Sequence, residues 1–151
     1  MTDLGRITMA LEAVEDPEIP VTLADLGVLR AVKVDAAGVK VVLRPTRLGC
    51  PARDRMERDV ADAVRRVAGD VAVEVDWEMA PWTDEDVSPA GKAALAEIGY
   101  ALLLGGSARC PYCGSDDARR EGAFGGALCK SPFTCRSCGS TFDALRSSDQ
   151  R

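Results

Sequence analysis

The sequence predicts an α+β fold in which covering helices pack on a small mixed sheet, followed by a small four-cysteine ribbon. Apolar residues recur with helical and then with alternating spacing through residues 3–98. Two Cys-x-x-Cys-Gly sequences follow near the C-terminus. The 151 residues suffice for one well-packed domain and a small metal-bound module. We therefore predict an α+β domain at 1–101, a linker at 102–108, the ribbon at 109–146 and a flexible tail at 147–151.

The first half of the domain reads as a helix followed by a β-hairpin. The helix is predicted over residues 3–14, where apolar side chains share one stripe, and the prolines of Asp16-Pro-Glu-Ile-Pro20 end it. Strands are expected at 28–35 and 39–44, because their apolar residues alternate on either side of the turn Asp35-Ala-Ala-Gly38.

The second half reads as helix, strand, helix. A long helix over residues 51–68 has its apolar side chains on one face, namely Met56, Val60, Ala63, Val64 and Val67. A third strand follows, in which Val71, Val73, Val75 and Trp77 alternate. Ser88 is the predicted N-cap of a short helix that runs through Ile98 and ends at Gly99.

The two Cys-x-x-Cys-Gly sequences predict a metal site. Cys110 and Cys113 form one pair, Cys135 and Cys138 the other, and 21 residues separate the pairs. Each pair on a tight turn presents two sulfurs to one point, so two such turns make a cage of four thiolates. The spacing predicts one structural zinc ion per chain, with two disulfides or free thiols as the alternatives. Iron also suits such a cage and would indicate a rubredoxin-like electron carrier.

Charge and composition exclude several functions. The net charge is −5, with −7 over residues 1–108 and +2 over 109–151, so neither part has the clustered cations of a nucleic-acid-binding ribbon. No apolar run has membrane-spanning length, and no secretory signal is recognised, so we expect a cytoplasmic protein with no membrane anchor. Histidine is absent, which removes histidine-dependent catalysis. We do not expect a conventional enzyme.

Cys50 is the second candidate for chemistry. It precedes Pro51, which is favoured at the first position of a helix. There the helix dipole, with Arg47 and Arg53 close in sequence, would stabilise a thiolate able to bind a soft metal or a cluster. A buried packing residue is the alternative.

The roles of two further groups of residues remain open. Asp16, Glu18 and Asp25 flank the prolines and the turn at Asp25-Leu-Gly27. These carboxylates suit helix and turn capping better than metal binding. Cys129, between the two cysteine pairs, is favoured as a packing residue over a redox-sensitive thiol or a further ligand. We expect Phe124, Phe133 and Phe142 to form the small core of the ribbon.

These motifs together resemble a known family. Asp16-Pro-Glu-Ile-Pro20, Asp25-Leu-Gly-Val28 and Gly49-Cys50-Pro51 resemble the iron–sulfur assembly domain of SufT-like proteins. Ala80-Pro81-Trp82-Thr83 and the ribbon with its Phe142-Asp143 resemble the PaaD-like family, which is encoded with the multicomponent phenylacetyl-CoA epoxidase. The resemblance runs from about residue 15 to residue 143.

The resemblance implies an accessory factor for iron–sulfur cluster maturation in such an oxygenase system. It implies a client such as the reductase component of the oxygenase. By the same resemblance Cys50 is a transient iron or cluster ligand, and the Asp16–Pro20 loop belongs to the same surface. A cluster bridging two Cys50 thiolates would need a homodimer. The alternative is a non-catalytic docking subunit of the oxygenase complex.

Overall fold

A computed structural model describes residues 3–46, 52–103, 107–122 and 130–145. Within these ranges the chain divides into two units. The first unit contains the described residues up to Pro45 and from Ala52 to Ala80. The second contains Thr46 and the described residues from Pro81 onward.

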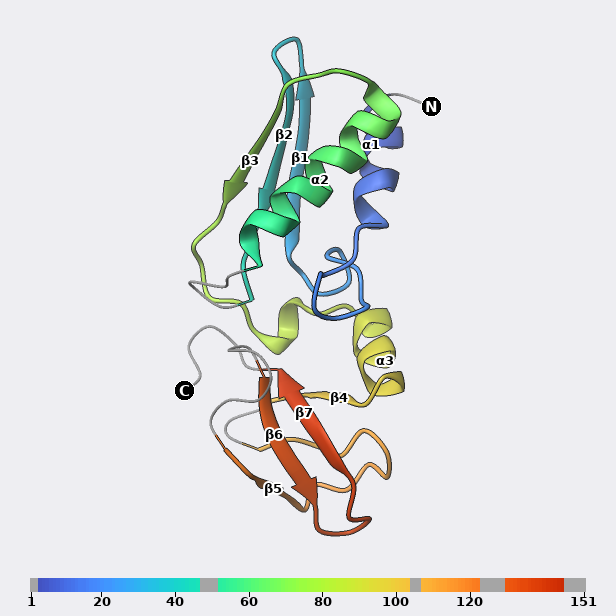
Figure 1. The fold of residues 1–151 in the computed structure, drawn as a ribbon, viewed down its shortest axis with the longest axis vertical. Helices are drawn as coiled ribbons and strands as arrows, with labels where there is room; N and C mark the ends of the chain where they lie inside the picture. The colour runs from blue at the N-terminus through green and yellow to red at the C-terminus, as the bar shows by residue number, and fades with distance from the viewer. Residues whose placement is uncertain (1–2, 47–51, 104–106, 123–129, 146–151) are drawn as a thin grey trace. The chain divides into compact units, whose positions relative to one another are not determined.

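The first unit is a three-stranded sheet with two helices. It contains α1 (Asp3–Glu12), β1 (Leu29–Asp35), β2 (Gly38–Leu43), α2 (Arg53–Ala68) and β3 (Val73–Trp77), as Figure 1 shows. The strand order is β1-β2-β3. β1 and β2 are an antiparallel hairpin, whereas β2 and β3 are parallel. α2 is therefore the crossover connection that a parallel pair requires.

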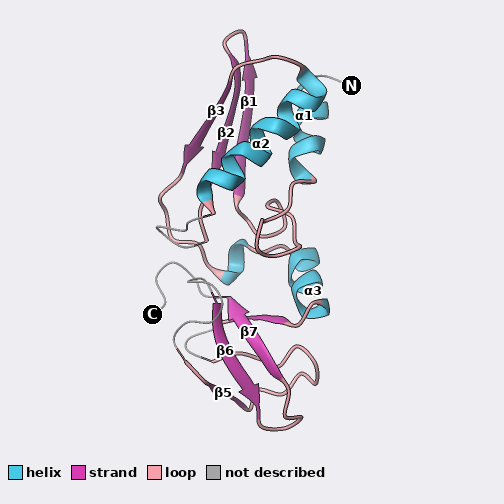
Figure 2. Ribbon diagram, viewed as in Figure 1, coloured by secondary structure: helices cyan, strands magenta, loops and turns pink. Residues whose placement is uncertain are grey.

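One face of this sheet forms the core of the unit. Val39, Val41 and Leu43 alternate along β2 with buried side chains. They pair in register with Val73, Val75 and Trp77 of β3. Both helices pack against this sheet and against each other (Figure 2). The buried helical residues are Ile7, Leu11, Met56, Val60, Ala63 and Val64.

The predicted elements of the first unit are confirmed, with changes at their ends. The long helix begins at Arg53 rather than at residue 51, and the third strand begins at Val73, so Val71 lies outside it. Val67 is only half-buried, and Leu4 is exposed. These shifts lie at the ends of the elements, where the regular backbone hydrogen bonds stop. The periodicity of apolar residues does not mark that position.

The second unit begins with short helical segments. A 3₁₀ turn, η1, spans Asp84–Asp86 and is not predicted by the sequence pattern. α3 spans Pro89–Glu97, and the Ser88 side chain accepts a hydrogen bond of 2.9 Å from the N–H of Gly91. The predicted N-cap is therefore confirmed. Gly99 follows with φ +82°, a left-handed conformation that favours glycine at a helix end.

A four-stranded sheet completes the second unit. Its strands are β4 (Tyr100–Leu102), β5 (Ala118–Arg120), β6 (Lys130–Cys135) and β7 (Thr141–Leu145), in the order β4-β7-β6-β5. β4 runs parallel to β7, and the other pairs are antiparallel.

The ribbon starts earlier in the chain than the sequence indicated. Leu102, the first residue of the predicted linker, belongs to β4, and the N–H of Leu103 donates to the carbonyl of Leu145 at 2.9 Å. Ala108 is buried in the ribbon core. α3, which the sequence pattern assigns to the 1–101 domain, falls in the second unit. A three-residue strand has too little periodicity to be detected, and its partner is distant in the sequence. The predicted tail, 147–151, lies outside the described residues.

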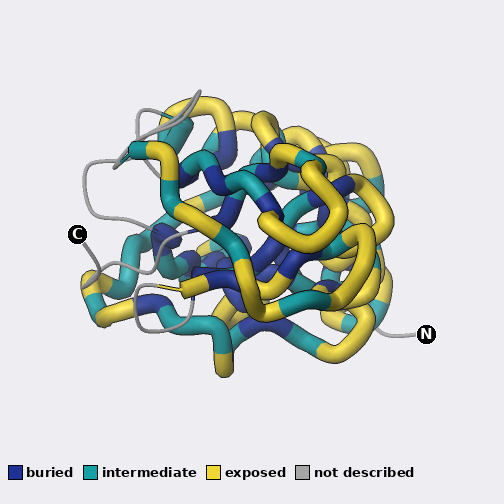
Figure 3. The backbone as a smooth tube through the Cα atoms, turned by 90° about the horizontal axis from the view of Figure 1, so that it is seen from below, coloured by how far each residue is buried: buried dark blue, intermediate teal, exposed yellow. Residues whose placement is uncertain are grey.

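The ribbon core is small and partly aromatic. Phe133 and Phe142 stack with ring centroids 5.7 Å apart, as their pairing in register allows. This confirms two members of the expected aromatic core, and Phe124 lies outside the described residues. Figure 3 colours the backbone by burial and shows buried segments, in dark blue, alternating along the chain with exposed ones, in yellow. The buried cluster comprises Ala101, Leu103, Ala108, Cys110, Phe133, Cys135, Phe142 and Ala144.

Candidate metal centre

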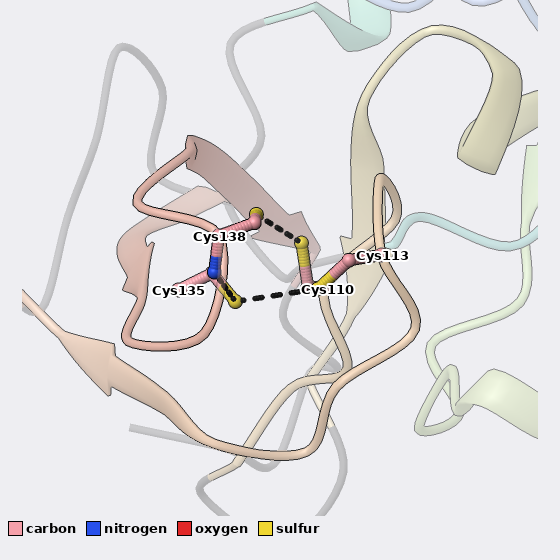
Figure 4. Close-up of side chains that lie close together, drawn as sticks. All are labelled: Cys110, Cys113, Cys135 and Cys138. Carbon is pink, nitrogen blue, oxygen red and sulfur yellow. Dashed lines mark hydrogen bonds between the residues drawn. The ribbon is translucent and has the colours of Figure 1, made fainter.

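The structure brings the four predicted cysteines together. Cys110 and Cys113 lie on a turn before β5, Cys135 ends β6, and Cys138 lies on the turn between β6 and β7. One cysteine of each pair is buried and the other exposed. The sheet thus delivers two loops, distant in sequence, to one place (Figure 4).

Each pair folds into the same turn. The N–H of Gly114 donates to the carbonyl of Cys110, and that of Gly139 donates to the carbonyl of Cys135, both at 2.9 Å. The two glycines have φ of +77° and +78°. A left-handed residue at this point closes the turn with little steric cost only when it is glycine. The glycine after each Cys-x-x-Cys therefore helps to direct both sulfurs of its turn towards the same point.

The sulfur positions fit a tetrahedral metal. All four Sγ atoms lie within 4.8 Å of one another. Cys110 and Cys138 are separated by 3.8 Å between their sulfurs, and Cys113 and Cys135 by 3.6 Å. Zinc–sulfur bonds of about 2.3 Å in a tetrahedron place the sulfurs about 3.8 Å apart. All four are free cysteines. The donor set of four sulfurs suits zinc and also iron.

The four thiols differ in how readily they ionise. Hydrogen bonds from the hydroxyl and then the backbone N–H of Ser140 lower the pKa of Cys138 to about 6. The backbone N–H of Cys138 lowers the pKa of Cys135. The backbone N–H of Ser115 acts to lower the pKa of Cys113, but the hydrogen bond with Cys135 and burial outweigh it and raise that pKa to about 12. Because thiolates so close repel one another, a bound cation is what allows all four to ionise.

Polar contacts tie the two turns together. The hydroxyls of Ser115 and Ser137 lie 2.8 Å apart, one on each turn. The Arg136 guanidinium donates to the Asp117 carboxylate at 3.0 Å, and its backbone N–H donates to the Asp117 carbonyl at 2.8 Å. Sequence reasoning missed these partners. Their only sequence signal is that serines stand beside the cysteines.

The acidic loop residues make hydrogen bonds within their own loop. A carboxylate oxygen of Asp16 accepts hydrogen bonds from the N–H groups of Glu18 at 2.8 Å and Ile19 at 3.1 Å. Asp25 donates its backbone N–H to the hydroxyl of Thr22 at 3.1 Å. Within the part of the chain that the structure describes, the four cysteines are the only side chains that converge as metal ligands. The geometry of Asp16 favours the capping role.

Cys50 and Cys129 lie outside the described residues, as does Arg47. Arg53, the other cation expected to act on Cys50, is described. Its guanidinium carbon lies 4.7 Å from the centroid of the Trp77 ring, and Trp77 donates its indole N–H to Glu57 at 2.6 Å. The first turn of α2 is therefore joined to the end of β3. This contact was not predicted, because nothing in the sequence links residues so far apart.

Two protein families match the two parts of the chain. Residues 5–77 match the family described as "Iron-sulfur cluster assembly protein", and residues 102–146 match the "PaaD zinc beta ribbon domain". A relative from Escherichia coli, named as a putative subunit of the 1,2-phenylacetyl-CoA epoxidase, is 33% identical over 93% of this chain and 91% of its own length. The chain belongs to the PaaD-like family.

Other relatives of this PaaD-like chain align with a smaller part of it. An "Fe-S protein maturation auxiliary factor" of Porphyromonas gingivalis is 37% identical over 62% of this chain and 89% of its own length. The crystal structure of a "Domain of Unknown Function DUF59" from Bacillus anthracis has a TM-score of 0.56 and 29% identity, covering 62% of this chain and 91% of that one. A hypothetical protein from Thermotoga maritima has a TM-score of 0.50 and 28% identity, covering 60% and 93%.

Of the helices in the described ranges, none combines the length and the apolar character needed to cross a bilayer.

Proposed function

We propose that this PaaD-like protein is an accessory factor for iron–sulfur cluster assembly or maturation in a phenylacetyl-CoA epoxidase-type oxygenase system, and not itself an enzyme. The observation that carries the proposal is the near full-length similarity to a protein named as an epoxidase subunit, in a chain whose larger domain matches an iron–sulfur assembly family. The auxiliary-factor name of the Porphyromonas gingivalis relative supports the same role. The reducing cytoplasm is the expected setting.

We assign a structural zinc ion to the ribbon. Cys110, Cys113, Cys135 and Cys138 would hold it, and the metal would supply the positive charge that lets four close thiols ionise. The sulfur separations of 3.6 and 3.8 Å are close to those of a tetrahedral zinc site and support this assignment. Other residues hold the two turns in position. The two glycines shape the turns, and the serine pair and Arg136 join them.

Cys50 is the proposed transient ligand or transfer thiol, with Asp16, Glu18 and Asp25 in a supporting loop. The support is its position in sequence, three residues before the first residue of α2. A thiol near a helix N-terminus is stabilised as the thiolate that binds iron or a cluster.

Metal and sulfide analysis tests this assignment. Zinc, iron and acid-labile sulfide would be measured in anaerobically purified wild-type protein, in Cys50→Ala and, as a matched control, in Cys129→Ala. We expect one zinc in all three and extra iron and sulfide that only Cys50→Ala loses. Normal cluster loading of the oxygenase reductase in a Cys50→Ala strain would refute a role for Cys50. Iron replacing zinc in all three would indicate a rubredoxin-like carrier.

The name of the Escherichia coli relative favours a second candidate, a non-catalytic docking subunit of the oxygenase complex. Purification at a fixed stoichiometry with the oxygenase would support that role, whereas purification as a free protein would exclude it. The molar mass of the purified protein, with and without iron, tests whether a cluster bridges two Cys50 thiolates in a homodimer.

A further inference from the structure

The ribbon carries a groove on the sheet face opposite its aromatic core. Its volume is about 380 Å³. The register places Tyr100 beside Asp143, and Asp143 beside Pro132, in one row across β4, β7 and β6. The N–H of Glu121 donates to the carbonyl of Pro132 at 2.8 Å and extends the row beyond β5. Phe133 and Phe142 are the next residues along their strands, so their side chains point to the other face.

Tyr112 stands at the edge of this groove, with 60% of its surface exposed. It lies between two metal-site cysteines, so its backbone is held by the first cysteine turn. Its hydroxyl end lies close to Gly99, where a Cβ would come within 2.2 Å of the hydroxyl oxygen. Ile98, also exposed, lines the same groove. An exposed aromatic side chain on a fixed backbone turn offers a large contact area to a partner, which is typical of a binding hot spot.

The charge within the groove is acidic at its centre. Asp143 is half-buried, and within the described ranges its carboxylate makes no hydrogen bond or ion pair. Glu121 is paired with Arg119 at 2.9 Å. Lys130 donates to the hydroxyl of Tyr100 at 2.9 Å and fixes that ring at the end of the row. The polar group of the groove that can pair with a partner is therefore the Asp143 carboxylate, which lies between Tyr100 and Pro132.

We propose that this groove binds an extended segment of a protein partner that presents one arginine or lysine between apolar side chains. The cation would pair with Asp143, and the apolar neighbours would pack against Tyr112, Ile98 and Pro132. A charge-assisted pair in a partly desolvated groove supplies specificity, while the exposed aromatic ring supplies contact area. The proposal rests on the proposed function, because the partner would be the protein whose cluster is matured.

A peptide titration tests the groove directly. The probe is a capped heptapeptide with one arginine between two leucines, added to the ¹⁵N-labelled, zinc-loaded full chain. A matched peptide carries glutamate instead of arginine. We expect amide shifts confined to Tyr112, Glu121, Thr134 and Thr141 with the arginine peptide, and weak or no shifts with the glutamate peptide. Equal affinity for both peptides, or shifts mainly outside the groove, would overturn the proposal.

Two variants and a control separate the contributions. Asp143→Asn keeps the shape of the side chain and should weaken the arginine peptide about tenfold. Asp143→Lys should reverse the preference towards the glutamate peptide. Glu97→Gln, an exposed residue of α3 that does not line the groove, is the matched control and should bind as the wild type does. Zinc content and amide dispersion confirm that each variant is folded. An unchanged affinity in Asp143→Asn would contradict the ion pair.

The docking groove and the cluster chemistry fail in different assays. If the groove is the docking site, Asp143→Lys leaves iron and sulfide on the purified protein unchanged but lowers cluster loading of the oxygenase reductase. Cys50→Ala lowers the iron and sulfide themselves. If the chain does not distinguish the two peptides but Cys50→Ala still lowers iron and sulfide, the groove is not the docking site. The proposed function then remains. Concentration-dependent shifts without peptide would instead identify a second copy of the chain as the occupant and overturn the proposal.

Discussion

The two units of the chain are stabilised in different ways. In the first, two helices and a three-stranded sheet enclose a continuous set of fully buried aliphatic side chains, among them Leu43, Val41 and Val60. In the ribbon, the buried cluster is smaller and includes two of the four metal-site cysteines. Small modules with little apolar core depend on metal or disulfides for stability. The comparison implies that metal loss should affect one unit and spare the other.

Zinc removal is expected to have the largest effect on this contrast. Chelation of the full chain should unfold the ribbon, because zinc contributes roughly 10 kcal/mol to folding of small zinc modules. Amide hydrogen exchange should show lost protection at Phe133 and Phe142 while Val41 and Val60 remain protected. Cys135→Ser should have the same effect, and Cys129→Ser is the matched control that should retain one zinc. Loss of protection in both units at once would show that they are not independent.

A core truncation should affect the opposite unit. Leu43→Ala removes a fully buried side chain from the centre of the first sheet and should cost about 2–5 kcal/mol of unfolding free energy. Urea unfolding followed by the NMR signals of Val41 and Val60 measures the loss, and zinc content should stay at one. The matched control, Val34→Ala on the exposed part of β1, should cost less than about 1 kcal/mol. A release of zinc from Leu43→Ala would contradict separate stabilisation.

Two glycines with positive φ distinguish steric clash from backbone strain. Gly38→Ala would place its Cβ 2.3 Å from the Ala72 carbonyl oxygen. It should lower the unfolding free energy by about 1–3 kcal/mol through this overpacking, in addition to the backbone strain of a positive φ. Gly114→Ala meets no atom within 4 Å, so only the strain of about 1–2 kcal/mol applies. Urea unfolding measures the first, and competition with a zinc indicator measures the second. A larger loss at Gly114 would mean that the cysteine turn tolerates no adjustment.

The smallest expected effect is at the start of α3. Ser88→Ala removes the side chain that accepts the Gly91 N–H and should cost about 1 kcal/mol. Hydrogen exchange of the first turn of α3 reports the change. Ser88→Asp keeps an acceptor at the N-cap and should restore the protection. If the alanine variant exchanges like the wild type, solvent satisfies that N–H equally well.

Most local structure could be predicted, and the long-range contacts could not. The helix at Arg53–Ala68 and the alternating residues of β2 carry complete periodic patterns, so their type and their buried faces followed directly. β4 carries three residues, and its pairing with β7 depends on a strand more than 35 positions away. The Arg53–Trp77 contact depends in the same way on the parallel register of β2 and β3. No window of sequence contains either relation.

The metal-binding turns are encoded locally, because a Cys-x-x-Cys-Gly segment sets the direction of its two sulfurs through short-range hydrogen bonds and one glycine. The alternation of helices and strands and the lack of histidine chemistry can likewise be read from the amino acids alone. Three relations are visible only in the folded chain. The four sulfurs of the two turns lie within 4.8 Å of one another, β4 belongs to the ribbon, and Tyr112 and Asp143 border one groove. Those relations depend on the register and order of strands, which are set by packing between segments that are distant in the chain.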